Sequence, residues 1–398
     1  MCPRVGDPLG PLLESDLMLN LDNCRERQQR LLKVMEEDQI DLAVITNPKT
    51  VYYFSGVLVN PALPQVFLLE SSGKAVLLTD ANVIEPDKKP KAAADKVETY
   101  RFHSMDRENI ATNWSQDVAA MLKTAGQEFL PSGGMLGLEF DSAPFAVSEA
   151  AREVARGGPK NLTPAIDQMR RQKDPDEIQC MRRSVNLVEA GLAAVKARLE
   201  PGMTEFRAYS IYYEAMVANA GTSVVLAGDF ATGLRGIKGG GPPTPRRVNM
   251  GDLYIFDTFP IFQGYMCDFT RTFVVGRPTQ IQQDAWGHVM EAHEIARRTI
   301  KPGVPAKEVY EAIKTHLDKF EAAEGSFWHH AGHGVGLNGW ELPWLTPGGE
   351  ETILDREVLA VEPGLYADAM QGGIRLEHNY LVTPEGVTAL DRFPMDLT

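Results

Sequence analysis

Four acidic residues stand in or beside apolar, strand-like segments of the C-terminal half, and they limit the folds open to this chain. Asp257 and Asp268 lie in FDTFPIFQGYMCDFTRT, which predicts a β-hairpin over 253–276 with its turn near Gln263–Gly264. Pairing about this turn predicts that the two aspartates lie opposite each other on one face, with Cβ atoms about 5 Å apart. The alternative is a pair of solvated carboxylates. The flanking aromatic residues weaken it, because they predict a buried hairpin where like charges need a cation.

Two glutamates repeat this pattern further along the chain. Glu362 ends an apolar strand predicted at 358–362, and Glu377 lies inside a strand predicted at 374–383. Arg375 is two residues before Glu377 and so shares its face of that strand. Either glutamate alone is equally well explained as an ordinary charge on a strand. Together with the two aspartates, however, they carry four negative charges, which two divalent cations would neutralise.

A stretch rich in histidine and glycine, HHAGHGVGLNGWELP at 329–343, supplies a nitrogen ligand for such a centre. Hard oxygen ligands with one imidazole suit Mn²⁺, Co²⁺, Fe²⁺ or Zn²⁺ better than a zinc site built from thiolates. Two such ions about 3.5–4 Å apart would share a bridging hydroxide and polarise a carbonyl group together. The pattern therefore predicts a hydrolytic centre with two divalent metal ions.

Length and charge narrow the remaining possibilities. A chain of 398 residues is long for one core, which predicts two domains. The net charge of −14 argues against nucleic acid or an anionic membrane as a partner. No apolar run approaches the roughly 18 residues that a membrane span requires. The N-terminus lacks the pattern of a secretory signal, and the four cysteines are far apart, so we expect a cytoplasmic protein.

Residues 1–165 alternate between short apolar segments and amphipathic segments. We interpret these segments as strands at 41–46, 65–70, 74–79 and 135–140 and as helices at 23–38, 109–125 and 146–156. This alternation is typical of an α/β domain with a largely parallel sheet. The domain contains no obvious cluster of catalytic residues, so we expect it to have a structural or oligomerisation role.

Residues 166–398 hold all the candidate site residues. We expect helices at 173–199, about 204–220, about 279–300 and about 305–324. The segment 231–247, ATGLRGIKGGGPPTPRR, is too rich in glycine and proline for regular structure and predicts a loop.

The ligand motifs, taken in order, resemble those of the pita-bread (M24-type) metallopeptidases. This family includes methionine aminopeptidase, aminopeptidase P and prolidase, with creatinase as a metal-free relative. The resemblance covers most of the chain, from ITNPKTVYYFSGV through the PGMTE junction to the last ligand motif. It implies a creatinase-like α/β domain over 1–165, followed by an α+β pita-bread catalytic domain over 166–398. Methionine aminopeptidases lack the large N-terminal domain, so the proline-specific branch is the closer relative.

The resemblance also implies a role for each site residue. It assigns the five metal ligands to Asp257, Asp268, His333, Glu362 and Glu377, with Asp268 and Glu377 bridging the two ions. Glu362 would also accept the proton of the bridging water. His329 falls on a histidine that supports the tetrahedral intermediate, and Arg375 matches an arginine behind the ligands. His330 has no counterpart in the family and is expected to pack, and Cys267 is expected to be a core residue.

Two positions depart from the family pattern. In the loop before the first ligand, a histidine position falls on Gly240. Seven residues after His333, the family's second histidine is replaced by Trp340, which Glu341 follows. In the family both histidines contact the substrate. We therefore expect a changed substrate-binding surface at these three positions, with Trp340 narrowing the pocket, stacking on a substrate ring or packing within its loop.

The leading interpretation is a metal-dependent Xaa-Pro aminopeptidase or dipeptidase, in which a metal-bridging hydroxide attacks the bond before proline. The alternative is a family member that acts on a small non-peptide substrate, by C–N hydrolysis or by dimethylsulfoniopropionate-lyase chemistry. A third interpretation is a scaffold protein, which the complete ligand set contradicts. The expected partners are a small peptide or small molecule and further copies of the chain, as a homodimer or a dimer of dimers.

Overall fold

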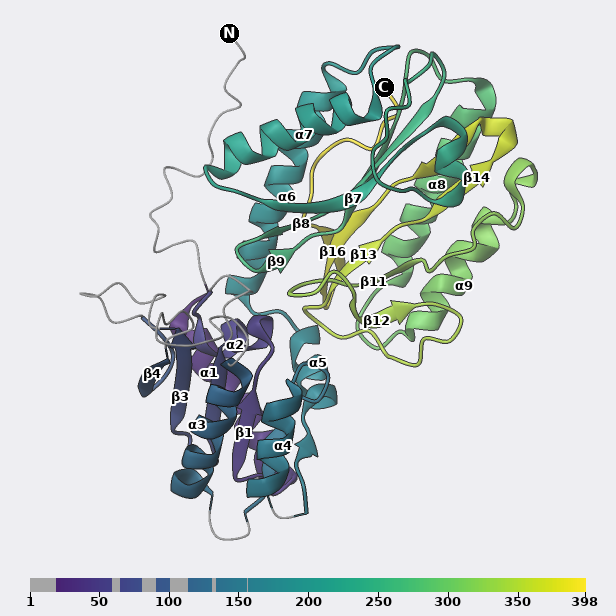
Figure 1. Ribbon diagram of the computed structural model, residues 1–398. Coiled ribbons are helices and arrows are strands. Elements are labelled where there is room, and N and C mark those ends of the chain that lie inside the picture. Colours follow the sequence, from purple (N-terminus) through teal and green to yellow (C-terminus); the bar gives the residue numbers. More distant parts are fainter. Residues whose placement is uncertain (1–18, 59–64, 81–90, 101–113, 131–133, 156) are drawn as a thin grey trace. The chain divides into compact units, whose positions relative to one another are not determined.

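The computed structural model describes residues 19–58, 65–80, 91–100, 114–130, 134–155 and 157–398 (Figure 1). The chain divides into two compact units, Met1–Met169 and Arg170–Thr398. The boundary expected between residues 165 and 166 falls inside helix α5 (Thr163–Arg171). None of the helices in the described ranges is long and apolar enough to cross a membrane.

The N-terminal unit contains a six-stranded sheet. Its strands are β1 (Leu42–Ile45), β2 (Val66–Glu70), β3 (Ala75–Asp80), β4 (Lys96–Tyr100), β5 (Leu136–Leu138) and β6 (Lys160–Asn161), in the order β4-β3-β2-β1-β5-β6. The sheet is mixed rather than largely parallel, because β2 runs antiparallel to both β1 and β3. The few residues that join β2 to β3 permit only a hairpin, since a parallel pair needs a crossover of a dozen residues or more.

Four helices complete the described part of this unit besides α5. They are α1 (Leu21–Glu37), α2 (Pro48–Ser55), α3 (Trp114–Phe129) and α4 (Phe145–Val154). Val118 and Leu122 of α3 and Val147 of α4 pack with Val44 and Leu68 of the sheet in one buried cluster. The helices expected at 109–125 and 146–156 correspond to α3 and α4. Residues 109–113 and 156 lie outside the described residues.

The C-terminal unit contains two larger sheets and a two-stranded ribbon. The first sheet has the order β10-β8-β7 and consists of β7 (Val225–Thr232), β8 (Leu253–Phe262) and β10 (Phe269–Val274), with β9 (Tyr265–Met266) beside β8. The second has the order β12-β11-β13-β16-β17 and consists of β11 (Gly332–Gly334), β12 (Glu341–Leu345), β13 (Val358–Val361), β16 (His378–Thr383) and β17 (Gly386–Ala389). The ribbon is β14 (Gly364–Ala367) with β15 (Gly372–Arg375).

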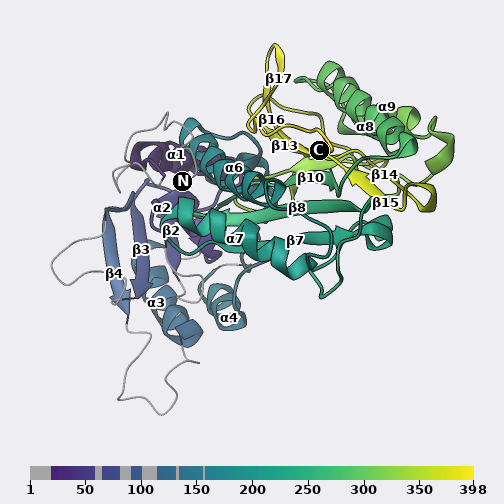
Figure 2. The same ribbon diagram turned by 90° about the horizontal axis from the view of Figure 1, so that it is seen from above.

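Pairs of helices cover the sheets of this unit. Helices α6 (Pro175–Lys196) and α7 (Glu205–Ala220) lie along β8 and β7, and α8 (Gln280–Thr299) and α9 (Ala306–Leu317) contact β15 and β12 (Figure 1 and Figure 2). The apolar faces of α8 and α9 form one buried cluster with residues of β13 and β15. The five candidate ligands lie on or directly beside β8, β10, β11, β13 and β16, and all five are buried.

The hairpin of β8, β9 and β10 has the expected turn but a different register. Gln263 and Gly264 have φ values of 51° and 82°, and they form a two-residue turn because Phe262 pairs with Tyr265. Asp257 therefore lies opposite Thr270, and the prediction that it faces Asp268 is wrong by two residues. A turn centred between residues 263 and 264 fixes this register. A shift of two keeps a side chain on the same face of a sheet, so both aspartates still face one site.

Two further strand predictions need correction. The strand expected over 374–383 is broken, because β15 pairs with β14 and β16 pairs with β13. Glu377 lies in the two-residue link between β15 and β16, not inside a strand. Strand β7 and a short 3-10 helix, η3 (Gly233–Lys238), occupy part of the segment expected to be a loop.

Candidate metal centre

The five predicted ligands come together in the C-terminal unit. One ligand atom each from Asp268, His333 and Glu377 lies within 4.8 Å of the others, although Asp268 precedes β10, His333 lies in β11 and Glu377 precedes β16. His333 Nε2 is 3.6 Å from Asp268 Oδ2 and 3.5 Å from Oε1 of Glu362, which directly follows β13. Asp257 is buried on β8 and interacts electrostatically with Asp268. The structure thus gathers buried carboxylates around one imidazole.

The hydrogen bonds of His333 fix which of its ring nitrogens carries the proton. Nδ1 is 2.9 Å from the carbonyl oxygen of Gly334. A carbonyl only accepts, so Nδ1–H is the donor and Nε2 keeps its lone pair. Burial lowers the pKa of His333, which keeps the ring neutral. His333 therefore presents an unprotonated nitrogen to the carboxylates, which is the form that binds a metal ion.

Several of these side chains have buried atoms that the protein does not satisfy. Asp257 Oδ1, His333 Nε2 and Glu377 Oε1 have no hydrogen-bond partner among the residues that the structure describes. Buried polar atoms are almost always paired, and each unpaired one costs about 1–3 kcal/mol. Carboxylate oxygens and an imidazole nitrogen are a donor set that suits borderline divalent cations. The residues present therefore fit a metal centre.

The charges of the cluster lead to the same conclusion. Burial raises the pKa of Asp268 well above its ordinary value, and the carboxylates of Glu377, Asp257 and Glu362 raise it further. The pKa of Glu377 rises for the same reasons. Like charges at this depth repel strongly, and bound cations would remove the repulsion.

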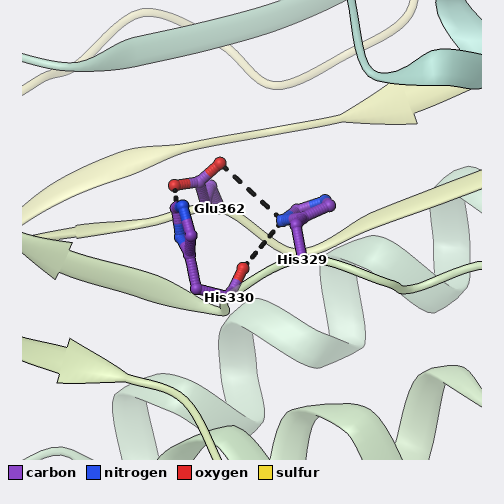
Figure 3. Close-up of side chains that lie close together, drawn as sticks. All are labelled: His329, His330 and Glu362. Atoms are coloured by element: carbon purple, nitrogen blue, oxygen red, sulfur yellow. Dashed lines mark hydrogen bonds and ion pairs between the residues drawn. The ribbon is translucent and has the colours of Figure 1, made fainter.

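Glu362 lies between two histidines (Figure 3). His330 Nδ1 is 3.1 Å from Glu362 Oε1, and His329 Nδ1 is 3.9 Å from Oε2. Burial raises the pKa of Glu362, but the three neighbouring imidazoles, His330 first, outweigh burial and lower it to about 2. His330 packs against Trp344, with ring centroids 5.2 Å apart, but its contact with Glu362 means that it does more than pack.

Both ring nitrogens of His329 are engaged. Nδ1 is 2.7 Å from the carbonyl oxygen of His330 and so carries the proton, while Nε2 accepts from the Tyr366 hydroxyl at 2.8 Å. Burial lowers the pKa of His329 to about 4, so the ring is neutral at pH 7. The Tyr366 hydroxyl also accepts from Arg375 Nη1 at 3.3 Å. Sequence reasoning missed Tyr366, because its contact with His329 arises only when the β14–β15 ribbon folds.

Arg375 contacts both a candidate ligand, Asp257, and the loop that contains Gly239. Its Nη2 binds Asp257 Oδ2, and its Nη1 donates to the carbonyl oxygen of Gly239 at 2.8 Å. Its Nε lies 3.9 Å from Glu362 Oε2. Arg375 therefore holds one oxygen of Asp257 and leaves the other free. Asn379 was also missed, although its side-chain amide pairs with both backbone groups of Asp268.

The three predicted substrate-binding residues lie in different surroundings. Gly240 has a φ of +154°, and a Cβ atom there would lie 2.4 Å from the Cβ of Asp229. Trp340 is 65% exposed. The Glu341 side chain is only 7% exposed and binds Arg170 and Lys173. This geometry favours a structural role for Glu341 over the predicted substrate contact.

Comparisons with known proteins cover both units. A model of metallopeptidase family M24 matches residues 179–384, and a model of the creatinase/prolidase N-terminal domain matches residues 27–172. The chain is similar to the Xaa-Pro dipeptidase of Pyrococcus furiosus, with 26% identity over 373 residues, which is 94% of this chain and 99% of that protein.

Solved structures agree with these matches. The prolidase from Pyrococcus horikoshii OT3 superposes with a TM-score of 0.78 at 24% identity, over 94% of this chain and 100% of that one. The Xaa-Pro dipeptidase from Bacillus anthracis superposes with a TM-score of 0.80 at 24% identity, over 94% and 99% of the two chains. The similarity therefore extends through both units rather than one.

Proposed function

Because the chain belongs to metallopeptidase family M24, we propose that it is a metal-dependent Xaa-Pro peptidase that hydrolyses the bond before proline. The predicted fold, a creatinase-like domain followed by a pita-bread domain, is confirmed by the two family matches. Relatives that align along nearly the whole chain are Xaa-Pro dipeptidases, which supports dipeptides as the first substrates to test.

This proposal rests on the convergence of five buried ligand side chains, of which Asp257, His333 and Glu377 each have a buried atom without a hydrogen-bond partner among the described residues. We infer that two divalent ions, of Mn, Co, Fe or Zn, bind Asp257, Asp268, His333, Glu362 and Glu377. Asp268 and Glu377 are the candidates for contact with both ions, because burial and the neighbouring carboxylates raise the pKa of each well above its ordinary value. When bound, such ions supply Lewis-acid chemistry, polarising the scissile carbonyl and lowering the pKa of water.

Residues of the chain itself accept the proton of the attacking water and hold the ligands and the reacting groups in position. Glu362 is ionised at neutral pH and accepts the proton of the attacking water, with His330 beside its Oε1. Arg375 holds Asp257 in place from behind. His329, aligned by Tyr366, lies on the Glu362 side of the cluster, where it supports the tetrahedral intermediate.

A small non-peptide substrate is not favoured, because the relatives named for an activity are Xaa-Pro dipeptidases. We further propose a reducing cytoplasmic location, because Cys267 is a buried cysteine without a disulfide bond.

The decisive experiment combines metal analysis with a dipeptide assay. Elemental analysis of the purified protein should find about two divalent ions per chain, and Ala-Pro should release proline until a chelator is added. Metal without proline release would overturn the peptidase assignment, and a protein that binds no divalent metal would contradict the hydrolytic centre itself.

A further inference from the structure

A fifth carboxylate lies beside the four carboxylates of the proposed metal centre without belonging to it. Asp229, on β7, is directly opposite Asp257 in the pairing of β7 with β8, so both side chains occupy one face of the sheet. Like charges directly opposite each other destabilise a sheet. The Asp229 side chain is 36% exposed, whereas that of Asp257 is 11% exposed. Asp229 is therefore the carboxylate of this pair that an incoming molecule can reach.

The nearby cations are already engaged by other groups. Arg375 Nη2 lies 3.8 Å from Asp229 Oδ2, but the same nitrogen binds Asp257. Arg235, the other cation that acts on Asp229, binds the fully buried carboxylate of Glu205. Asp229 and Asp257 together carry two negative charges and share one guanidinium. This leaves negative charge at the open edge of the site.

The loop opposite Asp229 is shaped to leave room for this carboxylate. A Cβ atom at Gly240 would lie 2.5 Å from both Cγ and Oδ2 of Asp229, so no side chain fits at position 240 while Asp229 keeps its place. The carboxylate thus fills the space in front of Gly240. A carboxylate accepts hydrogen bonds and binds cations, but when ionised it cannot donate to a carbonyl oxygen.

We propose that Asp229 binds an ammonium group of the substrate next to the scissile bond, an inference that rests on the proposed peptidase function. In a Xaa-Pro peptide this group is either the free α-ammonium of Xaa or the ammonium of a basic Xaa side chain. Either source forms a charge-assisted hydrogen bond with Asp229 and offsets its repulsion with Asp257. Asp229 is therefore a residue that determines specificity rather than a metal ligand.

Two matched substrate pairs test the proposal. Lys-Pro and norleucyl-proline differ only in the side-chain ammonium, and Ala-Pro and N-acetyl-Ala-Pro differ in the α-ammonium. In the wild type, kcat/KM should favour the charged member of at least one pair by about tenfold. Asp229→Asn should bring that ratio close to one with unchanged metal content. The control Asp284→Asn removes the same charge from the exposed surface of α8 and should leave both ratios unchanged.

A second variant separates the position of the carboxylate from its charge. Gly240→Ala keeps Asp229 but displaces it, and it should lower the same ratio. The proposal is overturned if both ratios in Asp229→Asn equal those of the wild type. It is also overturned if Asp229→Asn loses a metal ion, which would make Asp229 a ligand.

Calorimetry separates this proposal from the peptidase assignment, because it needs no turnover. L-Lysine should bind about tenfold more tightly than L-norleucine, or L-alaninamide more tightly than N-acetyl-L-alaninamide, and Asp229→Asn should abolish the difference. That result without proline release would refute the peptidase while supporting the ammonium site. Equal binding within both pairs, with proline released normally, would refute the ammonium site alone.

Discussion

Three histidines within five residues have different roles because their ring nitrogens have different partners. The Nδ1–H of His333 is bound to a carbonyl, and its Nε2 faces the carboxylates. His329 uses both nitrogens within the protein. His330 has a side chain 27% exposed and reaches Glu362. The family motif GHGVG was enough to predict His333 as a ligand. The difference between His329 and His330 depends on Tyr366 and Glu362, which only folding brings near them.

Asp268 is the residue whose loss should affect the metal centre most. Asp268→Asn should lose both ions and all activity, because the carboxylate lies among His333, Glu377 and Glu362. Asp257→Asn should mainly weaken one site, since Arg375 already neutralises one of its oxygens. Elemental analysis of the two variants beside the wild type checks this difference. Two metal equivalents retained by Asp268→Asn would refute its bridging role.

Tyr366 should matter for rate and not for metal content. Tyr366→Phe removes the donor to His329 Nε2 and the contact with Arg375, so His329 loses its alignment. We expect kcat to fall on the order of tenfold, with little change in KM and none in bound metal. The control is Tyr310→Phe on α9, whose ring stacks on Phe327, and it should have no effect on kcat. An equal fall in both variants would show a general loss of packing.

Trp340 is the site of a gain-of-function prediction. We expect it to face the scissile bond, where a hydrogen bond made in the transition state is worth about 2–4 kcal/mol. Trp340→His should therefore raise proline release from Ala-Pro without changing metal content. The exposed indole makes a loss of stability above about 0.5 kcal/mol unexpected. A wild type that already cleaves Xaa-Pro substrates at ~1–10³ per second would mean that another group replaces the missing histidines.

At the scale of elements, helices were easier to predict than strand partners. The amphipathic patterns located α6, α7 and α8 to within a few residues. Strand β7, VLAGDFAT, lacks a clear alternation because Gly228 and Asp229 interrupt it, so the sequence did not indicate a strand. The break between β15 and β16 was hidden for a different reason. A continuous apolar segment has the same sequence pattern whether its residues pair within one sheet or are divided between two.

Glu341 gives strand β12 a testable dependence on pH. Burial raises the pKa of Glu341, but Lys173 and Arg170 lower it from 4.5 to about 2. The unfolded chain therefore binds more protons between these values, and the stabilisation from Glu341 is lost as pH falls from about 4.5 to about 2. At pH 7, Glu341→Gln should lower the free energy of unfolding by about 3–5 kcal/mol, because two buried cations lose their partner.

Chemical denaturation of this variant at pH 7 and at pH 3 measures the effect. The difference from the wild type should shrink at the lower pH. Glu385→Gln, in the exposed turn before β17, should match the wild type at both values. A Glu341→Gln protein as stable as the wild type at pH 7 would mean that the ion pairs contribute nothing net.

At the scale of the whole molecule, the family resemblance predicted more of the fold than composition and hydrophobic periodicity did. Ligand motifs spread from Asp257 to Glu377 identified a fold that both family matches confirm. Length and periodicity alone predicted two domains, the first of them α/β, without the order of the strands in their sheets. Asp229 and Asn379 escaped prediction because neither belongs to a motif. Both became recognisable only through a neighbour on another strand.

Assembly is the prediction that belongs to the whole chain. The described residues of the N-terminal domain hold no candidate metal cluster, and the resemblance to the proline-specific branch implies that this domain helps to pair subunits. We therefore expect a homodimer or a dimer of dimers. Analytical ultracentrifugation at micromolar concentration should give a mass of at least two chains, and a monomer there would contradict the prediction.

The break between β15 and β16 has a consequence for how the protein matures. Glu377 meets its partner Thr270 across 107 residues of sequence, while Asp257 and Asp268 share one hairpin. At about 5–20 residues per second, a ribosome would extrude the hairpin on the order of 5–20 s before Glu377. During that interval, a newly synthesised chain carries the negative charges of Asp257 and Asp268 without a complete metal site to compensate them. If these residues bind metal ions as proposed, metal capture would be among the last events of folding, and the availability of the ion at that moment would decide how many newly made chains become active.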